Sequence, residues 1–93
     1  MAALERVIRA TKNEFIPRLD TSAQVEVGEA MLAALEAKYA DPNYDVTADF
    51  NNTKAMYKAL GSDEKSYFRT TAIAVYSGID YTALQPIIDM ILG

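Results

Sequence analysis

Apolar residues recur every three or four positions along most of the 93-residue chain, and no segment alternates apolar and polar residues as a β-strand does. The first of these stripes contains Leu4, Val7, Ile8 and Phe15. Such spacing places apolar side chains on one face of an α-helix, which then packs against other helices. The sequence therefore predicts an all-α protein, a compact bundle of about five short helices. An N-terminal antiparallel helical hairpin would be followed by three C-terminal helices.

Turn and capping residues set the expected ends of these helices. Pro17 lacks a backbone N–H and disfavours helical angles at the preceding residue, so the first helix should end near Phe15 and the chain should turn through residues 16–19. Thr21 and Gln24 form a capping-box pattern that starts the second helix. The second helix is expected to end at Ala40 or Asp41. The third should start at Asp45 or Thr47, with Gly61 as its C′ residue. The fourth should run from Ser62 to Gly78, and the fifth should start at Asp80 or Thr82.

The composition limits the chemistry open to this chain. A chain of this length builds one hydrophobic core, so residues 1–93 are expected to form a single domain. Hydrophobic residues are 51% of the chain, which excludes the disordered class. There is no Cys and no His, so disulfides, zinc–thiolate sites and imidazole general bases are excluded. We therefore predict a protein that is not an enzyme and that uses no cofactor.

The net charge of −4 is distributed unevenly. Residues 1–19 carry four bases and two acids, whereas residues 20–49 carry seven acids and one base. Proteins that bind nucleic acid usually carry a concentrated basic stripe, so no nucleic-acid partner is expected. Two explanations for the acidic segment are open. It can pack beside the basic first segment, or it can present an acidic face to a basic partner.

A protein partner would meet the acidic second helix and the corner that follows it. Tyrosine adds contact area at low entropic cost and is enriched at interfaces. Two of the six tyrosines, Tyr44 and Tyr81, fall in a loop or at a helix start and are candidates for exposure. Four others, Tyr39, Tyr57, Tyr67 and Tyr76, fall on stripes expected to face the core. The residues assigned to the partner surface are Tyr44, Glu26, Glu29, Glu36, Asp45, Asp49 and Tyr81.

Residues 41–52 resemble the calcium loop of the EF-hand family. The oxygen-bearing residues that match loop positions 1, 3, 5, 7 and 9 are Asp41, Asn43, Asp45, Thr47 and Asp49. The pattern departs from the family at position 6, where Val46 replaces glycine, and at position 12, where Asn52 replaces glutamate. A divalent-cation site is therefore an alternative to an ordinary corner between helices, because Asp, Asn and Pro are common in turns that bind no metal.

The last expected helix is apolar on more than one face. Beyond Pro86 its only charged residue is Asp89, so it either inserts between the other helices or packs against a second copy of the chain. In the second case Ile87, Met90 and Ile91 would form the dimer interface. No apolar run reaches the roughly 20 residues needed to span a bilayer, so we expect no membrane insertion and a cytoplasmic location.

The small size, the acidity, the lack of Cys and His and the several short helices together resemble the small bacteriocin immunity proteins. That resemblance implies a cytosolic antiparallel helical bundle of about this length. From the residues themselves, we expect a small, soluble, non-catalytic module of the inhibitor, immunity or adaptor type. It would bind a protein partner through an acidic helical face.

Overall fold

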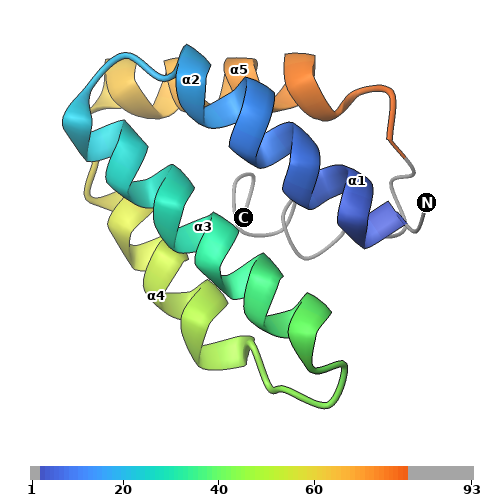
Figure 1. Ribbon diagram of the computed structural model, residues 1–93. Helices are drawn as coiled ribbons and strands as arrows, with labels where there is room; N and C mark the ends of the chain where they lie inside the picture. The colour runs from blue at the N-terminus through green and yellow to red at the C-terminus, as the bar shows by residue number, and fades with distance from the viewer. Residues whose placement is uncertain (1–2, 80–93) are drawn as a thin grey trace.

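The computed structural model describes residues 3–79, and every regular element in that range is helical, which confirms the all-α class (Figure 1). The fifth expected helix lies outside the described residues. One continuous helical segment and three separate helices make up the described part. The elements are α1 (Ala3–Ala10), the π-helical η1 (Thr11–Phe15), α2 (Ile16–Arg18), α3 (Ser22–Ala40), α4 (Thr47–Lys58) and α5 (Ser62–Tyr76).

The first helical segment continues through Pro17, so the expected end near Phe15 is wrong. A π-helical stretch precedes the proline, and the Ile16 N–H donates to the Thr11 carbonyl, five residues back. Proline in a regular α-helix collides with the carbonyl four residues before it, and the wider π turn relieves that collision. The segment ends instead at Arg18, since Leu19 adopts an extended conformation.

The start of α3 confirms the predicted capping box. The Thr21 hydroxyl oxygen accepts the Gln24 N–H at 3.2 Å, and the Gln24 Oε1 accepts the Thr21 N–H at 2.9 Å. Gln24 is also buried, and its Nε2 donates to the Glu64 carbonyl of α5 at 3.1 Å. A local capping residue therefore also joins two helices that lie 40 residues apart in the sequence. Helix α3 ends at Ala40, as predicted.

Two other helix starts differ from the prediction by one residue. The residue before α4 is Val46, and the Asp45 carboxylate instead accepts the Thr47 N–H at 3.0 Å. The residue before α5 is Gly61 rather than Ser62, and the Glu64 carboxylate accepts the Gly61 N–H at 3.4 Å. Gly61 therefore precedes α5 and does not close α4, which ends at Lys58.

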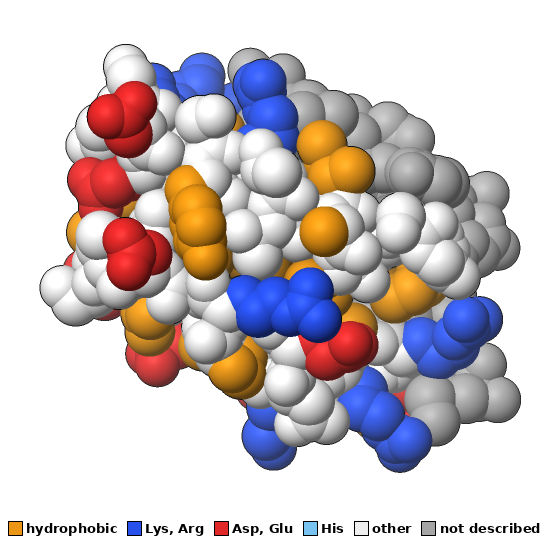
Figure 2. All heavy atoms as spheres, turned by 90° about the horizontal axis from the view of Figure 1, so that it is seen from above, with side chains coloured by type: hydrophobic (Ala, Val, Ile, Leu, Met, Phe, Trp, Pro, Cys, Tyr) orange, Lys and Arg blue, Asp and Glu red, His pale blue; other side chains and the backbone are white. Residues whose placement is uncertain are grey.

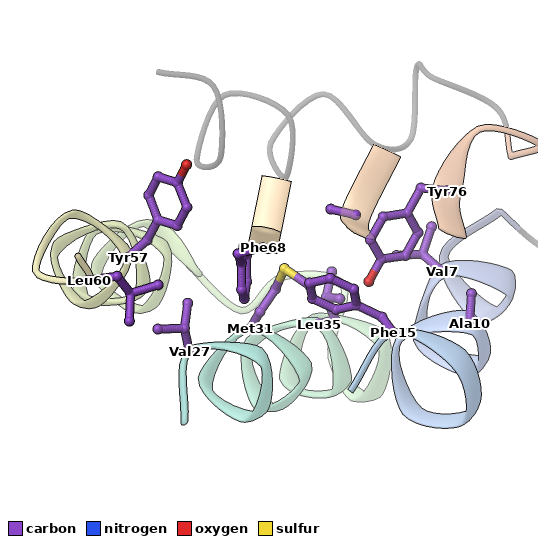
Figure 3. Close-up of a cluster of buried hydrophobic side chains, with 11 residues drawn as sticks. Val7, Ala10, Phe15, Val27, Met31, Leu35, Tyr57, Leu60, Phe68 and Tyr76 are labelled. Atoms are coloured by element: carbon purple, nitrogen blue, oxygen red, sulfur yellow. The ribbon is translucent and has the colours of Figure 1, made fainter. Parts of the chain in front are cut away.

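Aromatic rings form the centre of the core (Figure 3). Phe15 and Phe68 are fully buried and meet edge to face, with ring centroids 4.9 Å apart. Tyr76 packs against Phe15 and Tyr57 against Phe68, each at 5.5 Å. Edge-to-face and tilted ring pairs are favourable because the positive edge of one ring meets the negative face of another. The expectation that Tyr57 and Tyr76 pack inside is confirmed.

The helices are arranged in layers around these rings. Helix α3 contacts both α1 and α4, and α5 contacts α1 and η1. In Figure 3 the buried side chains stand between the layer formed by α1 and α3 and the helix α5. The buried sides of α1 and α3 therefore face α5.

Gly28 lies where the end of the first helical segment approaches α3. A Cβ atom added at Gly28 would stand 3.0 Å from Leu19 Cδ1 and 3.1 Å from Ile16 Cγ1. Within a helix, glycine costs about 1 kcal/mol relative to alanine. Here that cost is offset by the close packing of Ile16 and Leu19 on α3, since a larger residue would require these side chains to shift by a few tenths of an ångström.

Candidate interaction surface

Three carboxylates form a ridge along α3. Glu26, Glu29 and Glu36 are exposed, as the sequence predicts, and the exposed Ala33 lies between them. At 1.5 Å per residue the ridge is about 15 Å long. We call these three glutamates the acidic ridge. The buried residues of α3 lie on the opposite side of the helix and are Gln24, Val27, Gly28, Met31, Ala34 and Leu35.

The corner between α3 and α4 is held by a lysine of the chain itself. The Lys38 ammonium donates to the Pro42 carbonyl at 2.7 Å and to the Tyr44 carbonyl at 3.1 Å. The Asp41 carboxylate accepts the Asn43 N–H at 3.0 Å, which closes a turn of the kind that aspartate favours. The loop carbonyls of the corner therefore already have a cationic partner.

Tyr44 is exposed at this corner, as predicted, with 40% of its surface accessible. Its hydroxyl donates to Asp49 Oδ2 at 2.9 Å. That hydrogen bond, together with the negative charge of Asp49, raises the pKa of Tyr44 above its usual value. The hydroxyl is thus fixed as a donor to Asp49, while the ring remains available for contact with a partner.

The residues proposed for an EF-hand-like site have other structural roles in the corner. The carboxylates of Asp41, Asp45 and Asp49 accept hydrogen bonds from neighbouring groups, and Thr47 begins α4 instead of lying in an open loop. Within residues 3–79 no group of three or more His, Cys, Asp or Glu side chains is placed to hold a metal ion. The cation site remains a prediction.

The pKa of the Asp45 carboxyl is expected to rise when Thr47 is replaced by valine. In the native chain the Thr47 hydroxyl and backbone N–H donate to Asp45 and lower its pKa, and the Lys38 charge adds to this effect. Valine removes the hydroxyl and keeps the N–H. A lowered folded-state pKa contributes stability above the unfolded-state pKa, and this contribution is lost as the pH falls through the folded value.

Carboxyl-carbon NMR titration between pH 2 and pH 6 measures this change. Asp45 should titrate at a lower pH in the native chain than in Thr47→Val. An Asp45 titration that is identical in the two proteins would contradict the assigned hydrogen bond.

The sequence missed several exposed residues. Tyr39 and Tyr67 were expected to face the core, but they are 50% and 45% accessible, and Ile73 is 54% accessible. The Tyr67 hydroxyl donates to the Arg18 carbonyl at 2.6 Å, which satisfies an open carbonyl at the end of α2. Periodicity alone places Tyr39 on the stripe of Leu35 and Met31, so only the packing of α1 against α3 identifies it as exposed.

A shallow groove of about 330 Å³ lies between α1, η1 and the end of α3. Two bases line it on one side, and Tyr39 lines it on the other. Its full lining is Glu5, Ile8, Arg9, Lys12, Asn13 and Tyr39. The groove therefore combines positive charge with an exposed aromatic ring.

The basic first segment does pack beside the acidic α3, as one of the two explanations of the charge pattern expects. The ionised side chains that form hydrogen bonds within residues 3–79 are Lys38, Asp41, Asp45, Asp49 and Glu64. The acidic ridge and the exposed bases of α1 are not among them. Figure 2, which looks down on α2 and α5, shows most acidic side chains at one edge and basic side chains over the middle and the opposite side.

Tyr81 of the partner surface, and Ile87, Met90 and Ile91 of the proposed dimer interface, lie outside the described residues. Within the described part of the chain, no helix has both the length and the apolar character needed to cross a membrane.

Comparison with known proteins identified no relative of this chain. No family model matches the chain, and searches of curated proteins and of solved structures found no significant match.

Proposed function

We propose that this protein is a small, non-catalytic interaction module that binds a basic surface of a protein partner through the acidic ridge. Inhibitor, immunity and adaptor proteins work in this way. One observation carries the proposal. Three glutamates stand exposed on the side of α3 that faces away from the core, and they form no hydrogen bond within residues 3–79.

Like charges lie close together on the acidic ridge. Glu26 and Glu29 are three residues apart on one helix, a spacing at which like charges destabilise the helix by about 0.2–0.5 kcal/mol. A basic partner would replace this repulsion with attraction. A ridge of one charge sign also attracts the partner at a distance and raises the association rate.

The corner that follows α3 adds a contact that does not depend on charge. Tyr44 is exposed. Its hydroxyl is held by Asp49, and its backbone carbonyl is held by Lys38. A tyrosine ring held in place loses little entropy on binding, which is typical of the anchor residues of interfaces. We assign Tyr44 the role of anchor beside the acidic ridge.

The proposal is tested by neutralising the ridge. We expect the triple variant Glu26→Gln, Glu29→Gln, Glu36→Gln to fold normally and to associate with the partner at least about 10-fold more slowly at low salt. The difference in association rate between the variant and the wild type should become smaller as the salt concentration is raised, because salt screens exposed charges. Affinity capture with the immobilised protein, from extracts of the cells that produce it, identifies the partner. Surface plasmon resonance then measures the association rate.

A matched control separates ridge binding from a general effect of charge. The variant Glu14→Gln, Asp20→Asn, Asp63→Asn removes three exposed acids from other parts of the surface and changes the net charge equally. It should capture the same partner as the wild type at a similar rate. Equal capture by the wild type, the control and the ridge variant would refute the proposal.

A further inference from the structure

Two shallow hollows flank the first helical segment. Helix α1 contacts both α3 and α5 and runs between them in Figure 1. The groove of about 330 Å³ described above lies on the side of α3, toward Tyr39. The second hollow, of about 410 Å³, lies on the side of α5, where Val75 and Ile79 line it. Each volume falls within the range of about 300–1,000 Å³ that is typical of ligand sites.

Arg9 and Asn13 form a crest between the two hollows. They are exposed, and they are the two residues that line both hollows. Being four residues apart, they are neighbours on one face of the helical segment. We call this crest and its two flanking hollows the α1 saddle. A ligand that lies across the crest contacts both hollows at once.

Three bases stand at the crest. Arg6 and Lys12 each line one hollow, and Arg9 lines both. All three are exposed, and none is among the side chains that form hydrogen bonds within the described part of the chain. A guanidinium group binds a carboxylate through two parallel hydrogen bonds, which are stronger than those between neutral groups. The crest is therefore suited to a carboxylate.

Apolar side chains line the hollows on both sides of these bases. Ile8 is partly buried and Tyr39 is half exposed on the side of α3, while Val75 and Ile79 are partly buried on the side of α5. These side chains keep some surface accessible to water, so apolar groups of a ligand gain free energy by covering it. The saddle thus favours a ligand that carries apolar groups on both sides of its anion.

Two glutamates limit the anions that the saddle accepts. Glu5 lines the groove on the side of α3, and Glu14 lines the hollow on the side of α5. They precede and follow the three bases in the sequence and are about 14 Å apart along the segment. A nucleic acid or an anionic membrane would bring further phosphates toward both glutamates, and like charges repel. A ligand with a single negative charge avoids this repulsion.

We propose that the α1 saddle binds a short segment of a partner protein that carries one acidic residue between apolar residues. The acidic side chain binds Arg9, with Arg6 and Lys12 beside it, and the apolar side chains enter the two hollows. This site goes beyond the proposed function, because it uses the bases of α1 and not the acidic ridge of α3. Two sites of opposite charge would allow one small domain to join two partners, as an adaptor does.

Synthetic peptides are the probe for this site. Three nine-residue peptides carry a central glutamate flanked by pairs of leucine, isoleucine or phenylalanine, and in each control peptide glutamine replaces the glutamate. Two-dimensional NMR of the full chain locates binding, and fluorescence polarisation measures affinity. At least one peptide should shift the amide signals of residues 5–14, Tyr39 and residues 75–79. Its glutamine control should bind at least about 10-fold more weakly.

Variants of the crest test the role of the arginine. Arg9→Ala should weaken binding of the glutamate peptide at least about 10-fold, and Arg9→Lys should weaken it less, because lysine keeps the charge but not the paired hydrogen bonds. Arg6→Ala should weaken it in the same direction. Lys58→Ala, which removes an exposed base from α4 and changes the net charge equally, should leave binding unchanged. Circular dichroism confirms that each variant is folded.

Three results would overturn the proposal. The first is that no peptide of the panel shifts the signals of residues 5–14 at millimolar concentration. The second is equal binding of the glutamate peptides and their glutamine controls, which would show that the bases bind no carboxylate. The third is that a ten-nucleotide oligothymidine binds at the same residues more tightly than every peptide, which would make the saddle a nucleic-acid site.

Discussion

Replacing Phe68 by alanine is expected to lower the free energy of unfolding by about 3–5 kcal/mol. Phe68 is fully buried and contacts the rings of both Phe15 and Tyr57. Its removal leaves a cavity at the point where α5 packs on the rest of the chain and ends two ring contacts at once. A domain of this size has a total stability of roughly 5–14 kcal/mol, so the loss is a large fraction of the whole.

Urea denaturation followed by circular dichroism measures this loss. Ile73→Ala is the control, because it truncates an apolar side chain of the same helix at a site that is 54% accessible, and it should cost less than about 0.5 kcal/mol. Equal midpoints for the two variants would show that α5 does not pack through Phe68.

The second large effect concerns the buried pair Thr11 and Tyr76. The Thr11 hydroxyl donates to the Val7 carbonyl at 2.7 Å, so it accepts the hydrogen bond from the Tyr76 hydroxyl. Thr11→Val therefore leaves the Tyr76 O–H buried without an acceptor and should cost about 1–3 kcal/mol. Tyr76→Phe removes the donor and leaves Thr11 bonded to Val7, so it should cost less, about 1 kcal/mol.

The same pair produces a dependence on alkaline pH. Burial raises the pKa of Tyr76 well above its usual value near 10, although the hydrogen bond with Thr11 acts in the opposite direction. Above pH 10 the unfolded chain loses this proton while the folded chain keeps it. The unfolded state then binds fewer protons, so the free energy of unfolding falls as the pH rises.

Urea denaturation at pH 7, 9, 10 and 11 tests both statements. The wild type should lose stability above pH 10, and Tyr76→Phe should show a shallower loss because the group responsible is gone. At pH 7 Thr11→Val should be the less stable of the two variants. The reverse order at pH 7 would contradict the assigned hydrogen bond. Parallel pH curves for the wild type and Tyr76→Phe would contradict the raised pKa of Tyr76.

The residues that sequence analysis placed well are those whose behaviour depends on near neighbours. The Thr21–Gln24 capping box and the end of α3 at Ala40 are confirmed, because a cap is built from residues three or four apart. The exposure of Glu26, Glu29 and Glu36 is confirmed as well, since charged side chains take the solvent side of a helix when other residues can fill the core.

The sequence by itself thus determined the helical class, the absence of Cys and His chemistry and the position of the acidic ridge, because these follow from composition and from spacings within one helix. Only the tertiary structure decided that the first segment continues through Pro17, that Gly28 is the contact point of α2 on α3, and that Tyr39 is exposed. Each of these depends on contacts between different helical segments, and the spacing of residues within a single helix carries no information about which neighbour that helix will meet.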